Sequence, residues 1–164
     1  MGFAAEILRL SHAILGVLFF GGLVGRWIVL GLAQRADSLA AMRTLTRAAA
    51  PFERIVIVGG NVMLLLGILT ALAQGRPMLG PIQGAPVDWL FVSIVLLLTT
   101  IPLVPLVFLP KGRIFGRLMD DAIALDAVTP ELAAAWSDPT VRVAHVYELG
   151  VVSIVLALMI TKPF

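Results

Sequence analysis

The sequence predicts an all-α protein, a four-transmembrane-helix up-and-down bundle with short interfacial helices in its cytoplasmic connections. Composition is the first observation behind this fold class. Of the 164 residues, 60% are hydrophobic and only 13% are charged, about half the charged share of an ordinary soluble domain. The mean hydropathy is +1.03. The second observation is the uneven spacing of the charges, which leaves long uncharged runs between them. A soluble globular domain is therefore excluded.

Two of the uncharged runs are each long enough to cross a bilayer alone. Ile55 to Gly75 gives 21 residues without charge, and Trp89 to Pro110 gives 22. A helix of about 20 apolar residues spans a hydrocarbon core of roughly 30 Å. We therefore predict the second and third spans at 55–73 and 89–109.

The two outer runs are shorter, and each is interrupted by one charge. The run that starts at Leu10 has 16 residues and the run that starts at Leu149 has 13, but apolar sequence continues past Arg26 and backwards past Glu148. No small-residue cleavage site follows a short apolar core, so we expect the first segment to be retained rather than removed as a signal peptide. The predicted outer spans, 11–32 and 143–160, complete a single integral membrane domain over 1–164.

The first two connections differ in kind. Residues 33–54 contain several arginines among Ala, Leu and Met, and Asp37-Ser38 is a candidate N-cap. We expect a short interfacial helix here that ends before Pro51, because proline disfavours helical backbone in the residue before it. Residues 74–88 carry a glycine or proline every few positions, which predicts a loop.

The third connection, residues 110–141, is predicted to be partly helical. The stretch from Arg113 to Asp126 is amphipathic, and a second helix is expected to start at Thr129-Pro130-Glu131. This triplet combines a capping residue, a first-turn proline and an acidic residue that favours the positive end of the helix dipole.

Lysine and arginine counts predict the orientation. The first and third connections, with the helix ends beside them, hold nine of these residues, whereas the opposite side holds three: Arg9, Arg76 and Lys162. Positive residues concentrate on the cytoplasmic side. We expect a multi-pass protein of the bacterial inner (plasma) membrane with both termini outside, on the periplasmic side. There is no Lys/Arg cluster on a polar face, so no nucleic-acid partner is expected.

The two charges that interrupt the outer runs are expected to meet. In an up-and-down bundle the first span runs inward and the fourth runs outward, which brings Arg26 to a depth similar to that of Glu148. An unpaired charge inside a membrane costs several kcal/mol, and a paired one is tolerated. We therefore predict an Arg26–Glu148 pair with His145 one turn away on the same helix face. The pair either fixes the docking of two helices or belongs to a ligand-binding or proton-handling site.

Cysteine and histidine counts limit the cofactors. The chain has no cysteine, which excludes disulfides, iron–sulfur clusters and thiolate metal sites. Its two histidines, His12 and His145, are expected about 15–20 Å apart along the bundle, so one iron cannot bind both. His12 alone is a candidate haem or porphyrin ligand, with a hydrogen-bonded structural role as the alternative. We expect no protein-bound metal ion, and no Walker, Rossmann, HExxH or GxSxG pattern marks a catalytic residue.

Small and polar residues within the spans suggest helix–helix contacts. Gly21 and Gly25 form a small-xxx-small spacing on the first span, which permits close helix approach. Asn61 places an amide well inside the second span, where we expect it to need an interhelical partner.

The third span is expected to bend. Thr99 and Thr100 precede Pro102, and Pro105 follows one turn later. Each proline removes a helical hydrogen bond and leaves a carbonyl without its donor. Such carbonyls either line a pocket at the bend or are satisfied by hydroxyl groups and a neighbouring helix.

Several motifs together resemble a known family. Ser11-His12 is followed by Phe19-Phe20-Gly21-Gly22, the bend-prone third span opens at Trp89, and the chain ends in Leu158-Met-Ile-Thr-Lys-Pro-Phe164. In these features the chain resembles an uncharacterised bacterial family of predicted four-helix integral membrane proteins, described as a domain of unknown function. It is more remotely similar to the membrane protoporphyrinogen oxidases of haem biosynthesis. That resemblance implies haem or porphyrin binding, with His12 matching the first-span histidine.

The third span departs from the oxidase pattern. The oxidases carry ionisable residues there, whereas Trp89 to Pro110 contains none. The resemblance thus implies the fold and a haem b or porphyrin site, not the reaction.

Three functional hypotheses follow from the sequence. The first is a non-catalytic bundle that binds other membrane protein subunits, or a second copy of itself, as an accessory subunit of a membrane complex. The alternative is a redox-associated haem or porphyrin protein that uses His12. The third is a small transporter or proton path that uses Arg26 and Glu148.

Overall fold

The computed structural model describes residues 2–164, and within them the chain forms helices without any β-strand. The fold is all-α, and four helical segments are long and apolar enough to cross a membrane, as the sequence predicts. Their bounds are Phe3–Gln34, Leu39–Ala73, Trp89–Leu125 and Pro130–Thr161.

The second to fourth segments are built from shorter elements. The second comprises α2 (Leu39–Arg54), a π-helical turn η1 (Ile55–Gly59) and α3 (Gly60–Ala73), and the third comprises α4 (Trp89–Thr100), a π-helical turn η3 (Val104–Phe108) and α5 (Leu109–Leu125). The fourth comprises α6 (Pro130–Trp136) and α7 (Pro139–Thr161), while the first is the single helix α1 (Phe3–Gln34). The loop before α4 contains one 3₁₀ turn, η2 (Gly80–Gln83).

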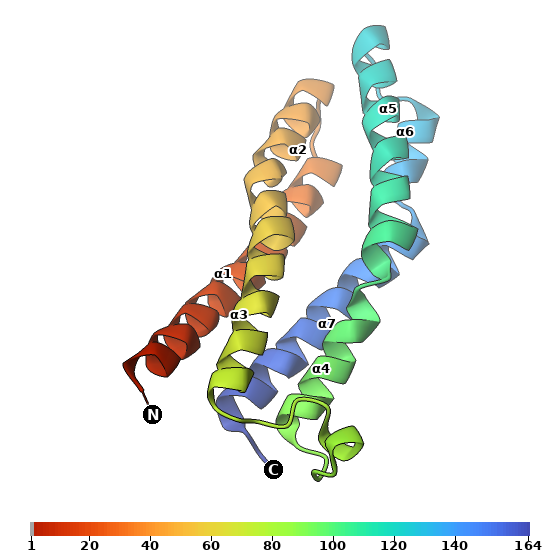
Figure 1. Cartoon of the computed structure of the whole chain (residues 1–164). Helices are drawn as coiled ribbons and strands as arrows, with labels where there is room; N and C mark the ends of the chain where they lie inside the picture. The colour runs from red at the N-terminus through yellow and green to blue at the C-terminus, as the bar shows by residue number, and fades with distance from the viewer. Residues whose placement is uncertain (1) are drawn as a thin grey trace.

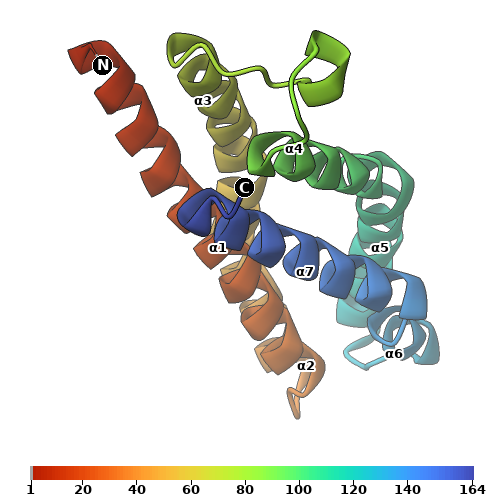
Figure 2. The same cartoon turned by 90° about the horizontal axis from the view of Figure 1, so that it is seen from below.

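The four segments form two hairpins that meet along α1 and α7 (Figures 1 and 2). In the first hairpin α1 packs on α2 and α3, and in the second α4 packs on α7 and α5 packs on α6. Figure 2 shows α7 crossing α1, with α4 beside α7. The chain therefore follows an up-and-down course, with each half folded as one hairpin.

Three clusters of buried residues join the hairpins at different heights. The first, which we call the distal cluster, contains Met42, Met119, Ala122 and Leu132. The middle cluster contains Leu23, Val56 and Val152, and the last contains Ala71, Trp89 and Leu90. Each combines residues of both hairpins, so the contact between the hairpins is apolar along its length apart from the charged site described below.

The prediction of a short interfacial helix that ends before Pro51 is wrong, because α2 contains Pro51. A helix does begin after Ser38, whose hydroxyl accepts a hydrogen bond from the backbone N–H of Ala41 at 3.2 Å. It then runs through Pro51 and continues into α3. Packing explains the continuity, because Phe52 and Ile55 of the turns after the proline lie directly against glycines of α1, and this contact offsets the one hydrogen bond that proline removes.

The third connection follows the prediction more closely. α6 starts at Pro130 with Thr129 as its N-cap, whose hydroxyl accepts from the backbone N–H of Leu132. α7 starts after Asp138, whose carboxylate caps the helix and also pairs with Lys111 of α5 at 2.7 Å. The amphipathic segment after the third span, however, is not a separate surface helix. It is part of α5, which follows α4 in one long segment with a bend between them (Figure 1).

The second and third segments exceed the thickness of a bilayer core. With 35 and 37 residues, they would measure about 52–56 Å at 1.5 Å per residue, whereas a hydrocarbon core is about 30 Å thick. The extra length contains α2, most of α5 and the distal cluster. These elements, with α6, form a small helical head at the arginine-rich end of the bundle.

Candidate functional site: a charged cluster between the hairpins

Arg26 and Glu148 lie together where α1 crosses α7. The Nη2 atom of Arg26 donates a hydrogen bond to Oε2 of Glu148 at 2.8 Å. Only 6% of Arg26 and 8% of Glu148 is exposed, so both charges are removed from solvent. Because an isolated charge is costly in such a place, each side chain stabilises the other's burial.

His145 completes the cluster one turn before Glu148. Its Nδ1 lies 3.2 Å from Nη2 of Arg26 and 3.8 Å from Oε2 of Glu148. The arginine can only donate, so this contact requires an unprotonated Nδ1, which accepts the hydrogen bond. The second distance is too long for a hydrogen bond. His145 is therefore joined to the pair through Arg26 rather than through Glu148.

Phe108 forms the aromatic wall of the cluster. Its ring stacks on the His145 imidazole with centroids 4.6 Å apart and planes 25° from parallel, and the Arg26 guanidinium lies 5.5 Å from its centroid. The ring belongs to the π-helical turn η3, and such turns are frequent at functional sites. Three helical segments thus contribute to one polar site.

One donor of the cluster has no partner. Nε of Arg26 is buried and makes no hydrogen bond within residues 2–164. A buried donor left in this state costs free energy that a bound acceptor would recover. The cluster can therefore hold the two hairpins together and still donate one further hydrogen bond, from Nε of Arg26.

His12 lies elsewhere, in the contact between α1 and α3. Its Nδ1 is 3.0 Å from the backbone oxygen of Met63. A carbonyl only accepts, so Nδ1 carries a proton and donates it, while Nε2 takes no part in this hydrogen bond. The ring rests on Gly67, where an added Cβ would be 2.9 Å from the His12 ring.

The glycines of α1 make close contacts, but with a spacing that differs from the expected one. A Cβ on Gly25 would lie 2.5 Å from the Phe52 ring, and one on Gly22 would lie 2.9 Å from Ile55. Gly21 has open space around it, since a Cβ added there would have no other atom within 4 Å. The packing pair is therefore Gly22 and Gly25, while Gly21 points away.

Asn61 has no interhelical partner within residues 2–164. It is exposed on α3, and its Nδ2 donates to the backbone oxygen of Ile57 of its own helix at 2.6 Å. One N–H of the amide and its carbonyl oxygen remain without a hydrogen bond. The interhelical partner that the sequence leads us to expect is not found among residues 2–164.

The bend in the third span is present, between α4 and α5 (Figure 1). α4 ends at Thr100, and a turn at Ile101 and Pro102 leads into η3. The hydroxyls of Thr99 and Thr100 donate to carbonyls of their own helix at 2.6 and 2.7 Å. These hydroxyls are thus used for local hydrogen bonding, although Thr99 also accepts from the Tyr147 hydroxyl of α7 at 2.6 Å.

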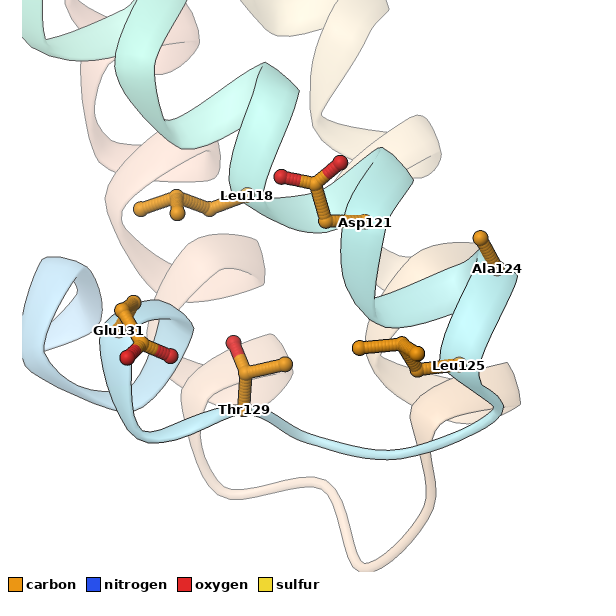
Figure 3. Close-up of a pocket in the computed structure, with 6 residues that line it drawn as sticks. All are labelled: Leu118, Asp121, Ala124, Leu125, Thr129 and Glu131. Atoms are coloured by element: carbon orange, nitrogen blue, oxygen red, sulfur yellow. The ribbon is translucent and has the colours of Figure 1, made fainter.

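A pocket of about 440 Å³ lies in the head, away from the charged cluster. Figure 3 shows its six lining residues, which come from α5, α6 and the connection between them: Leu118, Asp121, Ala124, Leu125, Thr129 and Glu131. Leu125 extends toward Thr129, and the Asp121 carboxylate points away from both. Within residues 2–164 no three His, Cys, Asp or Glu side chains are grouped to hold a metal ion.

Sequence reasoning missed Phe108 and Tyr147. Phe108 stands among apolar residues, so nothing in its sequence neighbours distinguishes it from a lipid-facing position. The available signal for Tyr147 was its place beside Glu148, with a hydroxyl that needs a partner inside a span. Phe108 is placed by the π-helical turn, which the sequence alone does not reveal.

No protein-family model, curated protein or solved structure matches the chain.

Proposed function

We propose that the protein is a non-catalytic, partner-binding subunit of a membrane complex. Asn61 carries this proposal. It is the only asparagine of the chain and lies six residues into an uncharged run of 21, about 9 Å along the helix from Ile55. Lipid tails offer neither donors nor acceptors, so an amide exposed there is stabilised by a polar group on another protein helix.

The size of the protein in its native membrane tests this proposal. Solubilised in a mild detergent, the wild-type chain should migrate in a complex larger than its own 17.5 kDa, and Asn61→Leu should reduce that complex. A wild-type protein that is strictly monomeric and co-purifies with nothing would overturn the proposal.

Haem or porphyrin binding at His12 is a second candidate function. The hydrogen bond from Nδ1 to the Met63 carbonyl supports it, because histidine ligands commonly donate one ring N–H to a carbonyl and bind through the other nitrogen. His12 therefore suits a single axial ligand, through Nε2. The test is an absorption spectrum of the purified protein, in which a Soret band should disappear with His12→Ala. Lack of that band in both native and haem-supplemented samples would reject this candidate.

Proton or solute movement through the charged cluster is a third candidate. The unpartnered Nε of Arg26 and the contact of His145 with both charges support it, since ionisable groups within membrane spans commonly mark transport pathways. Vesicles that contain the wild-type protein should show a flux of protons or solute across the membrane, and Glu148→Gln should abolish this flux. A flux that is unchanged in this variant would reject the transport function.

We infer that the protein lies in a bacterial inner membrane with its head in the cytoplasm and both termini outside. The concentration of nine of twelve lysines and arginines at the head end supports this orientation. Because the chain has no cysteine, single cysteines report it cleanly. A membrane-impermeant maleimide should label Gln83→Cys on intact spheroplasts and leave Ala124→Cys unlabelled until the membrane is opened. The reverse pattern would contradict the inference.

A further inference from the structure

The face around Asn61, formed by α3 and the preceding turn η1, is apolar and uncovered. Four residues one turn above and below it are exposed by 54, 61, 43 and 55%: Ile57, Val58, Leu64 and Leu65. α3 packs on α1 through its other side, where Gly60 contacts Phe19 and Gly67 contacts His12. We call the surface formed by Asn61 and these four residues the Asn61 face.

The amide has the right groups to bind an identical amide. One N–H is used by the Ile57 carbonyl, which leaves one donor and one acceptor on the same side chain. A second asparagine amide in the same state offers the complementary acceptor and donor. Two such amides can therefore satisfy each other, which a hydroxyl already bonded to its own helix cannot do as fully.

Membrane topology places two copies of this face in register. Copies of one chain insert in the same orientation, so the symmetry axis of a dimer runs along the membrane normal and pairs α3 with α3 in parallel. Asn61 then meets Asn61 at the same depth without any adjustment. The remaining positions bring leucine, isoleucine and valine together, with no like charges opposed.

We propose that the Asn61 face binds a second copy of this chain, forming a two-fold dimer in which the two Asn61 amides hydrogen-bond across the axis. This inference rests on the proposed partner-binding function and names the partner. A different protein would need a polar group at the same depth on an apolar face, whereas a second copy has one by construction.

Disulfide crosslinking in native membranes tests the dimer. Leu64→Cys lies on the Asn61 face, and the matched control Leu98→Cys lies on α4 with 56% exposure. Mild oxidation should link the Leu64→Cys chain into a species of twice its mass and leave the Leu98→Cys chain unlinked. Equal linking of both would indicate random collision and would overturn the assigned face.

The role of the amide is tested with two further variants in fluorescence energy transfer between labelled chains in vesicles. Asn61→Leu removes both reciprocal hydrogen bonds and should weaken association at least about 5- to 30-fold, the effect of losing a single interhelical hydrogen bond in a membrane, whereas Asn61→Gln keeps an amide and should retain most of the association. Equal association of both variants with the wild type would overturn the amide pairing. Because position 61 is exposed, neither substitution should change the helical circular dichroism or the melting temperature of the monomer. These two measurements serve as the folding control.

The crosslinking outcomes separate this inference from the proposed function. A Leu64→Cys chain that links only to a different protein would overturn the self-pairing and leave partner binding intact. A chain that links to nothing and sediments as a monomer would overturn both.

Discussion

Arg26 is surrounded by groups from two other helical segments that compensate its charge. A carboxylate, an imidazole and an aromatic face contact one guanidinium, while its Nε remains without a partner within residues 2–164. The pairing of Arg26 with Glu148 could be predicted because it follows from depth alone. The contribution of Phe108 could not, since it depends on how η3 rotates the helix.

The pair predicts a specific pattern of stability changes. Glu148→Leu leaves the Arg26 charge buried alone and should lower the free energy of unfolding by about 3–5 kcal/mol. The double variant Arg26→Met, Glu148→Leu removes both charges and should recover most of that loss. Unfolding in detergent by titration with sodium dodecyl sulfate measures both. If the double variant is as unstable as the single one, the pair is not the cause of the loss.

Two glycines about one turn apart on α1 offer a matched comparison. Gly25→Ala places a Cβ 2.5 Å from Phe52, and the resulting overpacking should cost about 1–3 kcal/mol. Gly21→Ala meets nothing within 4 Å and should be neutral or stabilising by up to about 1 kcal/mol. The same detergent titration compares them, and equal effects would show that the contact with Phe52 is not limiting.

Two prolines have opposite effects on their helices. α2 passes through Pro51 without ending, whereas α4 ends two residues before Pro102. The difference lies in the surroundings, because contacts with α1 hold the turns after Pro51, while Pro102 and Pro105 both disrupt hydrogen bonding within one turn. The bend at the third span could be predicted from this pair. The continuity at Pro51 could not, because it depends on which helix packs against the next turn.

The bend predicts a measurable change in length. Pro102→Ala with Pro105→Ala should restore helical hydrogen bonds and straighten the segment from α4 to α5. Spin labels at Val87 and Leu125, both exposed, should then move apart by several ångströms in pulsed electron resonance. As a control, Pro51→Ala with labels at Ala41 and Leu72 should leave the distance unchanged. A distance across the third segment that stays constant would mean that packing, not proline, sets the bend.

The assembled bundle consists of two hairpins held by three apolar clusters and one charged site. Charge spacing predicted the number of spans and their course. It did not predict the head. The helices α2 and α5 are amphipathic and contain arginines, so the uncharged runs stop at these helices. The apolar side of these helices is nevertheless covered, by the distal cluster.

The head predicts a strong effect from one side chain. Leu132 is fully buried in the distal cluster, and Leu132→Ala should reduce stability by about 2–5 kcal/mol. Leu125 lies nearby with 68% exposure, so Leu125→Ala should change stability by no more than about 0.5 kcal/mol. Thermal unfolding in detergent distinguishes them, and similar melting temperatures for both variants would contradict a packed head.

The sequence separation of Arg26 and Glu148 has a consequence for how the protein is made. The two residues are 122 positions apart, so at about 5–20 residues per second the ribosome needs roughly 6–24 s to synthesise the carboxylate after the arginine. During that interval the first hairpin enters the bilayer with a cation that has no counterion. Insertion of the last helix supplies the carboxylate, so the arginine gains its counterion only when the two hairpins dock.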